Sequence, residues 1–167
     1  MLRTIIYMRK SSEDETEKQA ESIHRQRRDI EAYLERNAME DEMTRLDVRD
    51  EDIHHEDASA KKLGRKEFTK VIEKIKKGRG LYKVLLCTEL TRLSRNPIDN
   101  GTVVSLLDDR EKDTENKYLE QVRTLDQIFR SNPTDKFTLS LFLSVAKFEN
   151  DMRAKNTSSG MQNRKSQ

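Results

Sequence analysis

Two cations and two hydroxyls follow directly on a short apolar stretch near the start of the chain, in the segment IIYMRKSS. Arg9 and Lys10 can pair with phosphate oxygens, and Ser11 or Ser12 can act as a nucleophile once its hydroxyl is activated. A strand that only fills a core has no need of such residues at its end. The segment therefore predicts a site that binds a phosphate group and reacts with it.

Two further polar segments carry residues of the same kinds. EDASAKKLGR supplies Ser59 and Arg65, and TRLSRN supplies Arg92 and Arg95. A single arginine in such a segment is most simply a solvated surface charge. Together, at the carboxyl ends of neighbouring parallel strands, the arginines favour a phosphate site, because one guanidinium group can donate two parallel hydrogen bonds to two phosphate oxygens. Arg92 and Arg95 are three residues apart, so a helical turn places both on one side.

The elements that must position these segments alternate between strand and helix. The apolar pattern and the capping signals predict strands at 2–7, 43–48, 82–90 and 118–125, and helices at 16–37, 65–77 and 97–110. Residues 49–64 are expected to form a polar loop. This alternation predicts an α/β domain with a mostly parallel central sheet and right-handed crossovers.

The composition limits the kinds of partner. With 33 basic and 31 acidic residues the formal charge is +2, so an anion site must come from local clustering. The single cysteine, Cys87, excludes an internal disulfide framework, is expected to be a core thiol, and fits a reducing cytoplasm. No apolar run reaches the length of a membrane span and no signal peptide is recognisable, so no membrane partner is expected.

A metal site is not expected either. His54, His55, Glu56 and Asp57 are adjacent in a predicted loop rather than spaced along one helical face. The chain is therefore expected to use no metal and no cofactor.

The last predicted helix begins at Thr134 and has two apolar faces. It is either a central helix of one domain, or it packs one face on its own sheet and the other on the same helix of a second copy, which is the favoured interpretation. The chain then divides into a core at 1–133 and a helix with a basic tail at 134–167; the tail is either disordered or leads into a further domain. One stripe consists of Phe137, Leu141, Val145, Phe148 and Met152, and the other of Leu139, Leu143 and Ala146.

These segments together resemble the serine recombinases, the group of resolvases, invertases and large serine integrases. YMRKSS has the Y-x-R-x-S frame of that family's first motif, and SIHRQ is similar to the next motif, which supplies Gln26. DASAKKLGRKEF resembles the loop that carries Ser59 and Arg65, and LTRLSRNP resembles the L-D-R-L-x-R-N signature. AKFENDMRAKNTSSG resembles the start of the long dimerisation helix. The LSRNP ending is most similar to the large serine recombinases of phages and mobile elements.

The resemblance implies a three-layer catalytic domain for site-specific DNA recombination. Ser11 would attack a DNA phosphodiester, form a 5′-phosphoserine and free a 3′ hydroxyl, with no metal and no ATP. The partners would be double-stranded DNA and a homodimer that assembles into a tetramer at synapsis, with no small-molecule substrate and with sequence reading left to a separate domain. The residues implied to assist Ser11 are Arg9, Gln26, Ser59, Arg65, Arg92 and Arg95, and the dimer interface would include Leu141, Val145, Phe148 and Met152.

The basic tail has two interpretations. Arg153, Lys155, Arg164 and Lys165 could follow the DNA backbone as the last helix leaves the domain, or could simply keep the tail soluble.

The sequence also departs from the family pattern. Thr91 stands where an aspartate is usual, Asn150 follows Glu149 where an arginine is common, and Ala60 replaces a glycine. Glu89 or Asp57 could replace the lost acid. These departures motivate the alternative of a catalytically impaired relative that binds or bridges DNA. A receiver-like or flavodoxin-like module is disfavoured, because receivers need clustered acids at the strand ends, where this chain has arginines.

Overall fold

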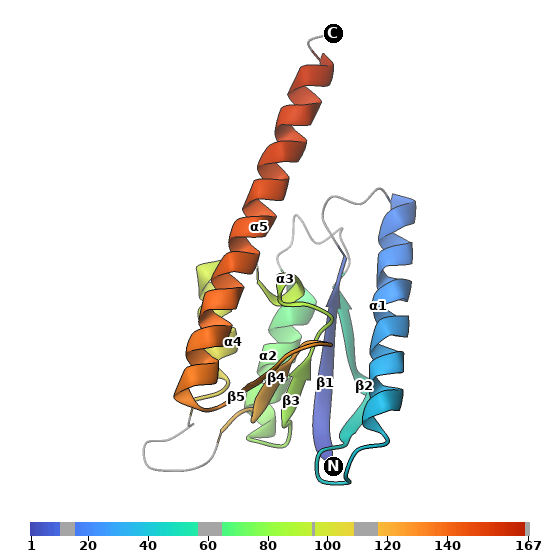
Figure 1. Ribbon diagram of the computed structural model, residues 1–167, viewed down its shortest axis with the longest axis vertical. Helices are drawn as coiled ribbons and strands as arrows, with labels where there is room; N and C mark the ends of the chain where they lie inside the picture. Colours follow the sequence, from blue (N-terminus) through green and yellow to red (C-terminus); the bar gives the residue numbers. More distant parts are fainter. Residues whose placement is uncertain (11–15, 57–64, 95, 109–116, 166–167) are drawn as a thin grey trace.

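A computed structural model describes residues 1–10, 16–56, 65–94, 96–108 and 117–165, without the side chains of residues 16–21, 154 and 157–165. It contains a five-stranded sheet with helices on both faces (Figure 1). The strands are β1 (Leu2–Arg9), β2 (Leu46–Glu56), β3 (Val84–Leu86), β4 (Gln121–Arg123) and β5 (Ile128–Arg130). The helices are α1 (Thr16–Asn37), α2 (Lys66–Gly78), α3 (Leu90–Leu93), α4 (Pro97–Ser105) and α5 (Pro133–Lys165).

The sheet is mostly parallel, as the sequence predicts. Its order is β2-β1-β3-β4-β5, and every neighbouring pair is parallel except β4 and β5. β1 lies inside the sheet, and Ile5 and Ile6 are buried on its opposite faces. Burial on both faces explains why this strand is apolar without alternation.

The helices form two layers around the sheet, so the domain has three layers in all (Figure 1). One face packs on α1, where Ile6 and Leu86 meet Ile30. The other face carries the larger core, in which residues of α2, α4 and α5 pack on Ile5 and Leu85. The α/β fold class predicted from the sequence is confirmed.

The second strand is longer than the sequence predicts. The pattern favours a strand at 43–48 and a loop from residue 49, whereas β2 extends through Glu56. Thr4 of β1 pairs with Val48, but Ile6 pairs with Ile53, so β2 contains a bulge between these two pairs.

A buried charge cluster accounts for this polar strand. Asp52 is completely buried in the bulge, where its carboxylate lies 2.6 Å from Nη2 of Arg3 and 2.8 Å from Nζ of Lys74. The hydroxyl of Tyr82 donates a further hydrogen bond to Asp52 at 2.9 Å. Because the buried carboxylate has partners on β1, on α2 and next to β3, a charged sequence can join the sheet at this point.

Three smaller differences begin at β3. The strand predicted at 82–90 is limited to Val84–Leu86, and a short helix, α3, forms within the loop that follows. The helix that begins at Pro97 ends at Ser105 rather than near residue 110. The antiparallel strand β5 is not predicted at all, because three residues carry too little periodicity to indicate a strand.

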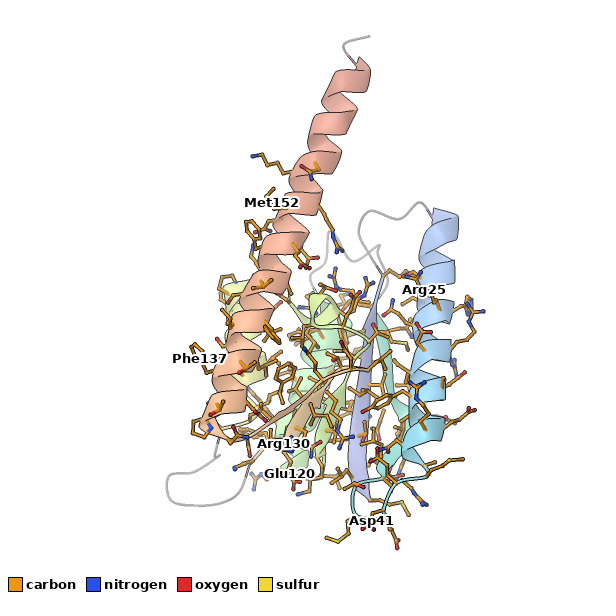
Figure 2. The ribbon with its side chains drawn as sticks, in the orientation of Figure 1. Arg25, Asp41, Glu120, Arg130, Phe137 and Met152 are labelled. Carbon is orange, nitrogen blue, oxygen red and sulfur yellow. The ribbon has the colours of Figure 1, made fainter. Side chains whose placement is uncertain are left out.

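The two faces of the last helix have different surroundings, as the sequence predicts. Leu139, Leu143 and Ala146 are buried against the domain. Figure 2 shows Phe137 and Met152 on the outer side of α5, and this helix projects beyond the sheet. In the part of the chain that the structure describes, no helix has the length and apolarity needed to cross a membrane.

Asp52→Asn is expected to lower the free energy of unfolding by about 3 kcal/mol, because Arg3 and Lys74 lose their buried counter-charge. Burial by itself raises the pKa of Asp52, but hydrogen bonds from Lys74 and Tyr82 and the nearby cations outweigh it and hold the pKa below its ordinary value. The stabilisation is therefore complete above the ordinary aspartate pKa and disappears as the pH falls through the lowered one.

Urea unfolding at neutral pH and in acid measures both effects. The matched control is Asp50→Asn, which alters an exposed carboxylate of the same strand and should change the stability by less than about 0.5 kcal/mol. Equal stability of the two variants at neutral pH would contradict the role given to Asp52.

Candidate active site

The polar segments predicted to form the site follow three neighbouring strands. β2, β1 and β3 are adjacent and parallel, so their carboxyl ends lie at one edge of the sheet. The structure describes Arg9, Gln26, Arg65 and Arg92 at or near this edge. The other predicted residues, Ser11, Ser12, Ser59 and Arg95, lie outside the described residues.

Arg9 binds the main chain of the α3 turn. It is the last residue of β1, and its Nε and Nη2 donate to the carbonyl oxygens of Arg92 and Thr91 at 3.2 and 2.9 Å. Gln26 of α1 donates from Nε2 to the carbonyl oxygen of Arg9 at 3.1 Å. Gln26 therefore holds the end of β1, and Arg9 holds the turn that carries Arg92.

Arg65 is buried and also binds main-chain oxygens. Its Nη1 donates to the carbonyl of Leu93 at 2.7 Å and to Asp99 Oδ2 at 2.8 Å, while Nη2 donates to the carbonyl of Arg92 at 3.0 Å. The guanidinium carbon lies 3.9 Å from the centre of the Phe68 ring. With a side chain only 5% exposed, Arg65 serves here to hold protein groups together.

A tyrosine and a glutamate complete this buried network. The hydroxyl of Tyr7 accepts a hydrogen bond from Arg65 Nη2 at 3.1 Å and donates to Glu56 Oε2 at 3.3 Å. Glu56 in turn accepts from the backbone N–H of Phe68 at 3.0 Å, at the start of α2, where a carboxylate is favourable. Burial raises the pKa of Tyr7 to about 12, so the phenol stays protonated at neutral pH and its part is to pack and bridge.

The sequence gives no local signal for this role of Glu56. Glu56 lies ten residues before the first residue of α2, an interval that no helix-capping rule predicts.

The described histidine and acidic side chains near the end of β2 do not form a metal site. Nδ1 of His54 on β2 lies 3.2 Å from Oε2 of Glu67 on α2. Among the described residues there is no group of three or more His, Cys, Asp or Glu side chains that could hold a metal ion.

Arg92 has an acidic partner on its own turn. Its Nη2 lies 2.6 Å from Oε1 of Glu89, which is half exposed, while its Nε is buried with no hydrogen-bond partner among the described residues. The hydroxyl of Thr91 is likewise buried and unpaired within the described chain. Of the two acids that could replace the aspartate missing at residue 91, Glu89 therefore contacts an arginine, and Asp57 lies outside the described residues.

The α3 turn also contacts the last helix. The hydroxyl of Ser94, which follows α3, and Nδ2 of Asn100, on α4, both donate to the carbonyl oxygen of Leu143, at 2.9 and 3.1 Å. Asn150 donates from Nδ2 to the carbonyl oxygen of Ser94 at 3.2 Å. One edge of the sheet, the arginine turn and α5 thus form a connected unit.

Comparison with protein families identifies this unit. The family model described as the resolvase N-terminal domain matches residues 4–167. The chain belongs to that family. A crystal structure of a resolvase-family site-specific recombinase from Streptococcus pneumoniae is similar to the resolvase domain with a TM-score of 0.58 and 20% identity, covering 100% of both chains. A comparison with curated proteins finds no match.

Membership of the resolvase family supports a role in site-specific DNA recombination at the level of the family, with DNA as a partner. The structural similarity, at 20% identity, supports the fold alone. Of the predicted site residues, the resolvase domain brings Arg9, Arg65 and the turn of Arg92 together, with Gln26 bound to Arg9. Arg153 and Lys155 are exposed on α5, and the side chains of Arg164 and Lys165 are outside the description.

Arg65→Lys is expected to lower the free energy of unfolding of the resolvase domain by about 2–4 kcal/mol, because one ammonium group cannot replace the forked donors and leaves Asp99 and buried carbonyls unpaired. Arg92→Lys keeps a single ion pair with a half-exposed partner and should change stability by about 1 kcal/mol or less. Denaturant unfolding measures both; an Arg65→Lys protein as stable as the wild type would refute the structural role.

Proposed function

We propose that the chain is the catalytic domain of a serine-type site-specific recombinase, which cleaves and rejoins DNA strands through a covalent 5′-phosphoserine at Ser11. The observation that carries the proposal is the contact of Arg9 with the turn of Arg92. Ser11 follows Arg9 by two residues and Arg95 follows Arg92 by three, so a contact between Arg9 and the turn of Arg92 supports a site shared by the two segments.

The reaction requires no metal and no nucleotide. The hydroxyl oxygen of Ser11 attacks phosphorus and loses its proton, the bond from phosphorus to the 3′ oxygen breaks, and that oxygen leaves as a hydroxyl. Arginine side chains stabilise the extra negative charge on the pentacovalent phosphorus. Attack by a 3′ hydroxyl on the phosphoserine reverses the step and frees Ser11, so the linkage retains the energy needed for rejoining.

The arginines have different parts in this proposal. Arg9 and Arg65 set the position of the turn through its carbonyl groups, and Arg92 and Arg95 supply the charge that faces the phosphate. Glu89 takes the place of the aspartate that is usual at position 91. Its Oε1 lies 2.6 Å from Nη2 of Arg92 and orients the guanidinium group from one side. Gln26 and Ser59 belong to the surroundings of the phosphate.

The alternative is a catalytically impaired relative that binds or bridges DNA. It is favoured by one observation: Thr91, at the position of the usual aspartate, offers no carboxylate, and its buried hydroxyl has no hydrogen-bond partner in the described part of the chain. The adduct experiment described next separates the two proposals.

Ser11→Ala is expected to abolish a denaturant-resistant protein–DNA adduct that the wild type forms, because the nucleophile is lost. The substrates are nicked duplexes that together cover the DNA flanking the gene, and the adduct is detected as a shifted band in denaturing gels. Ser12→Ala is the matched control and should retain adduct formation. Absence of an adduct with the wild type would favour the alternative, and an adduct that survives in Ser11→Ala would refute the assignment of the nucleophile.

The apolar stripe of α5 supports assembly of two copies along this helix, and of two such dimers at synapsis. Phe137 and Phe148 are 71% and 63% exposed, which is unusual for a row of large apolar residues on a monomer surface. The exposed stripe lies opposite the face that packs on the domain, so a second α5 can cover it without disturbing the core. The residues proposed for this interface are Leu141, Val145, Phe148 and Met152.

Phe148→Glu is expected to convert the protein from a dimer to a monomer, because a charge at the centre of an apolar interface remains unpaired. Ser140→Glu adds the same charge to an exposed position of α5 outside the stripe and serves as the control. Sedimentation equilibrium measures both variants. A wild type that is monomeric, or a Phe148→Glu protein of unchanged mass, would contradict the interface.

The projecting part of α5 supports a contact with the DNA backbone. Arg153 and Lys155 are exposed there, and Arg164 and Lys165 follow in the same helix. Such contacts with phosphates depend on salt and carry no sequence information.

A reducing cytoplasm is the compartment that we propose for the protein. It suits the single thiol, that of Cys87, which is buried and whose pKa is raised by burial.

A further inference from the structure

The carbonyl groups of the α3 turn are bound from three sides. Arg9 and Arg65 bind the carbonyls of residues 91–93 from the sheet edge and from the start of α2. The next carbonyl, that of Ser94, is bound by Nδ2 of Asn150 at 3.2 Å from α5, and the same nitrogen lies 3.5 Å from the carbonyl oxygen of Thr91. Asn150 therefore completes the set of donors around the turn.

Ser94 joins the turn to α5 in both directions. Its hydroxyl donates to the carbonyl oxygen of Leu143 at 2.9 Å, and its own carbonyl accepts from Asn150. Leu143 and Asn150 are seven residues apart, which is about two helical turns, so both lie on the face of α5 that packs on the domain. Ser94 itself is completely buried.

The opposite face of α5 carries the exposed apolar stripe. At 3.6 residues per turn, Asn150 lies on the side of the helix away from Leu141 and Phe148. One helix thus presents the proposed dimer surface on one side and binds the arginine turn on the other. A shift of α5 must either carry the turn with it or break the hydrogen bond from Asn150.

We propose that Asn150 is a positioning residue, which ties α5 to the turn carrying Arg92 and Arg95 and so fixes these arginines relative to the dimer helix. The effect on cleavage rests on the function proposed above; the effect on the turn does not. An amide suits this position because one nitrogen offers two N–H donors to two carbonyl groups. The carbonyls at the end of α3 carry partial negative charge, which favours a donor and disfavours a carboxylate.

The test compares two substitutions that keep the size of the side chain. Asn150→Asp replaces the donor by an oxygen that repels the carbonyls. Asp151→Asn makes the reverse change at the next residue, which is exposed and pairs with Lys147 of the same helix. Asn150→Gln restores an amide donor on a longer side chain and tests for rescue.

The first measurement is amide hydrogen exchange in the free, full-length protein. The amides of Arg92 and Ser94 donate to the carbonyls of Glu89 and Leu90 at 3.1 and 2.9 Å and report on the α3 turn. Asn150→Asp is expected to speed their exchange about tenfold, the size of one net hydrogen bond. Asp151→Asn should leave it unchanged, and Asn150→Gln should bring it closer to the wild-type rate.

The second measurement is the rate of adduct formation at saturating nicked duplex. Asn150→Asp is expected to reduce this rate roughly tenfold while the affinity for DNA and the mass in sedimentation stay as in the wild type. Unchanged exchange at Arg92 and Ser94 would overturn the proposal, as would faster exchange with an unchanged rate. If the wild type forms no adduct, the proposed function fails, and the exchange of Asn150→Asp alone decides whether Asn150 positions the turn.

Discussion

The arrangement of the site depends on two guanidinium groups that bind consecutive main-chain carbonyls. Arg9 and Arg65 reach the carbonyls of residues 91–93 from two different elements, and Asp99 is the carboxylate that balances Arg65. The carbonyls at the end of a helical turn carry partial negative charge, so they are suitable partners for buried cations. These hydrogen bonds tie the carbonyls of the short α3 turn to β1 and to the start of α2, while Leu90 and Leu93 pack in the same core as Ile5 and Tyr7.

This constraint divides arginines that look alike in the sequence. Arg65 is almost completely buried among oxygens and on the Phe68 ring, while Arg92 pairs with an acid of its own turn that is half exposed. The motif spacing places both at the same edge but says nothing about the direction of each side chain. The direction of the Arg65 side chain is decided by partners far away in the chain, such as Asp99 and the carbonyl of Leu93.

Periodicity predicted the alternation of elements, the parallel sheet, the shared edge and the two faces of α5, because each depends on residues close in sequence. It failed for β2, where Asp52 is accommodated only by Arg3, Lys74 and Tyr82 from other elements. It also missed Glu56, whose partners are the hydroxyl of Tyr7 on β1 and the backbone N–H of Phe68 on α2. Long-range pairing of charged groups is invisible to local patterns, and that pairing accounts for the longer β2 and for the buried role of Glu56.

The outer strands of the sheet have a consequence for self-association. A flat, apolar outer strand recruits strands from other molecules, which leads to aggregation. Here β2 is interrupted by a bulge and carries exposed charges at residues 49–51, and β5 has only three residues. Neither strand is a good template for edge-to-edge growth, which leaves the exposed stripe of α5 as the surface for the proposed dimer, an assembly that symmetry closes after two copies.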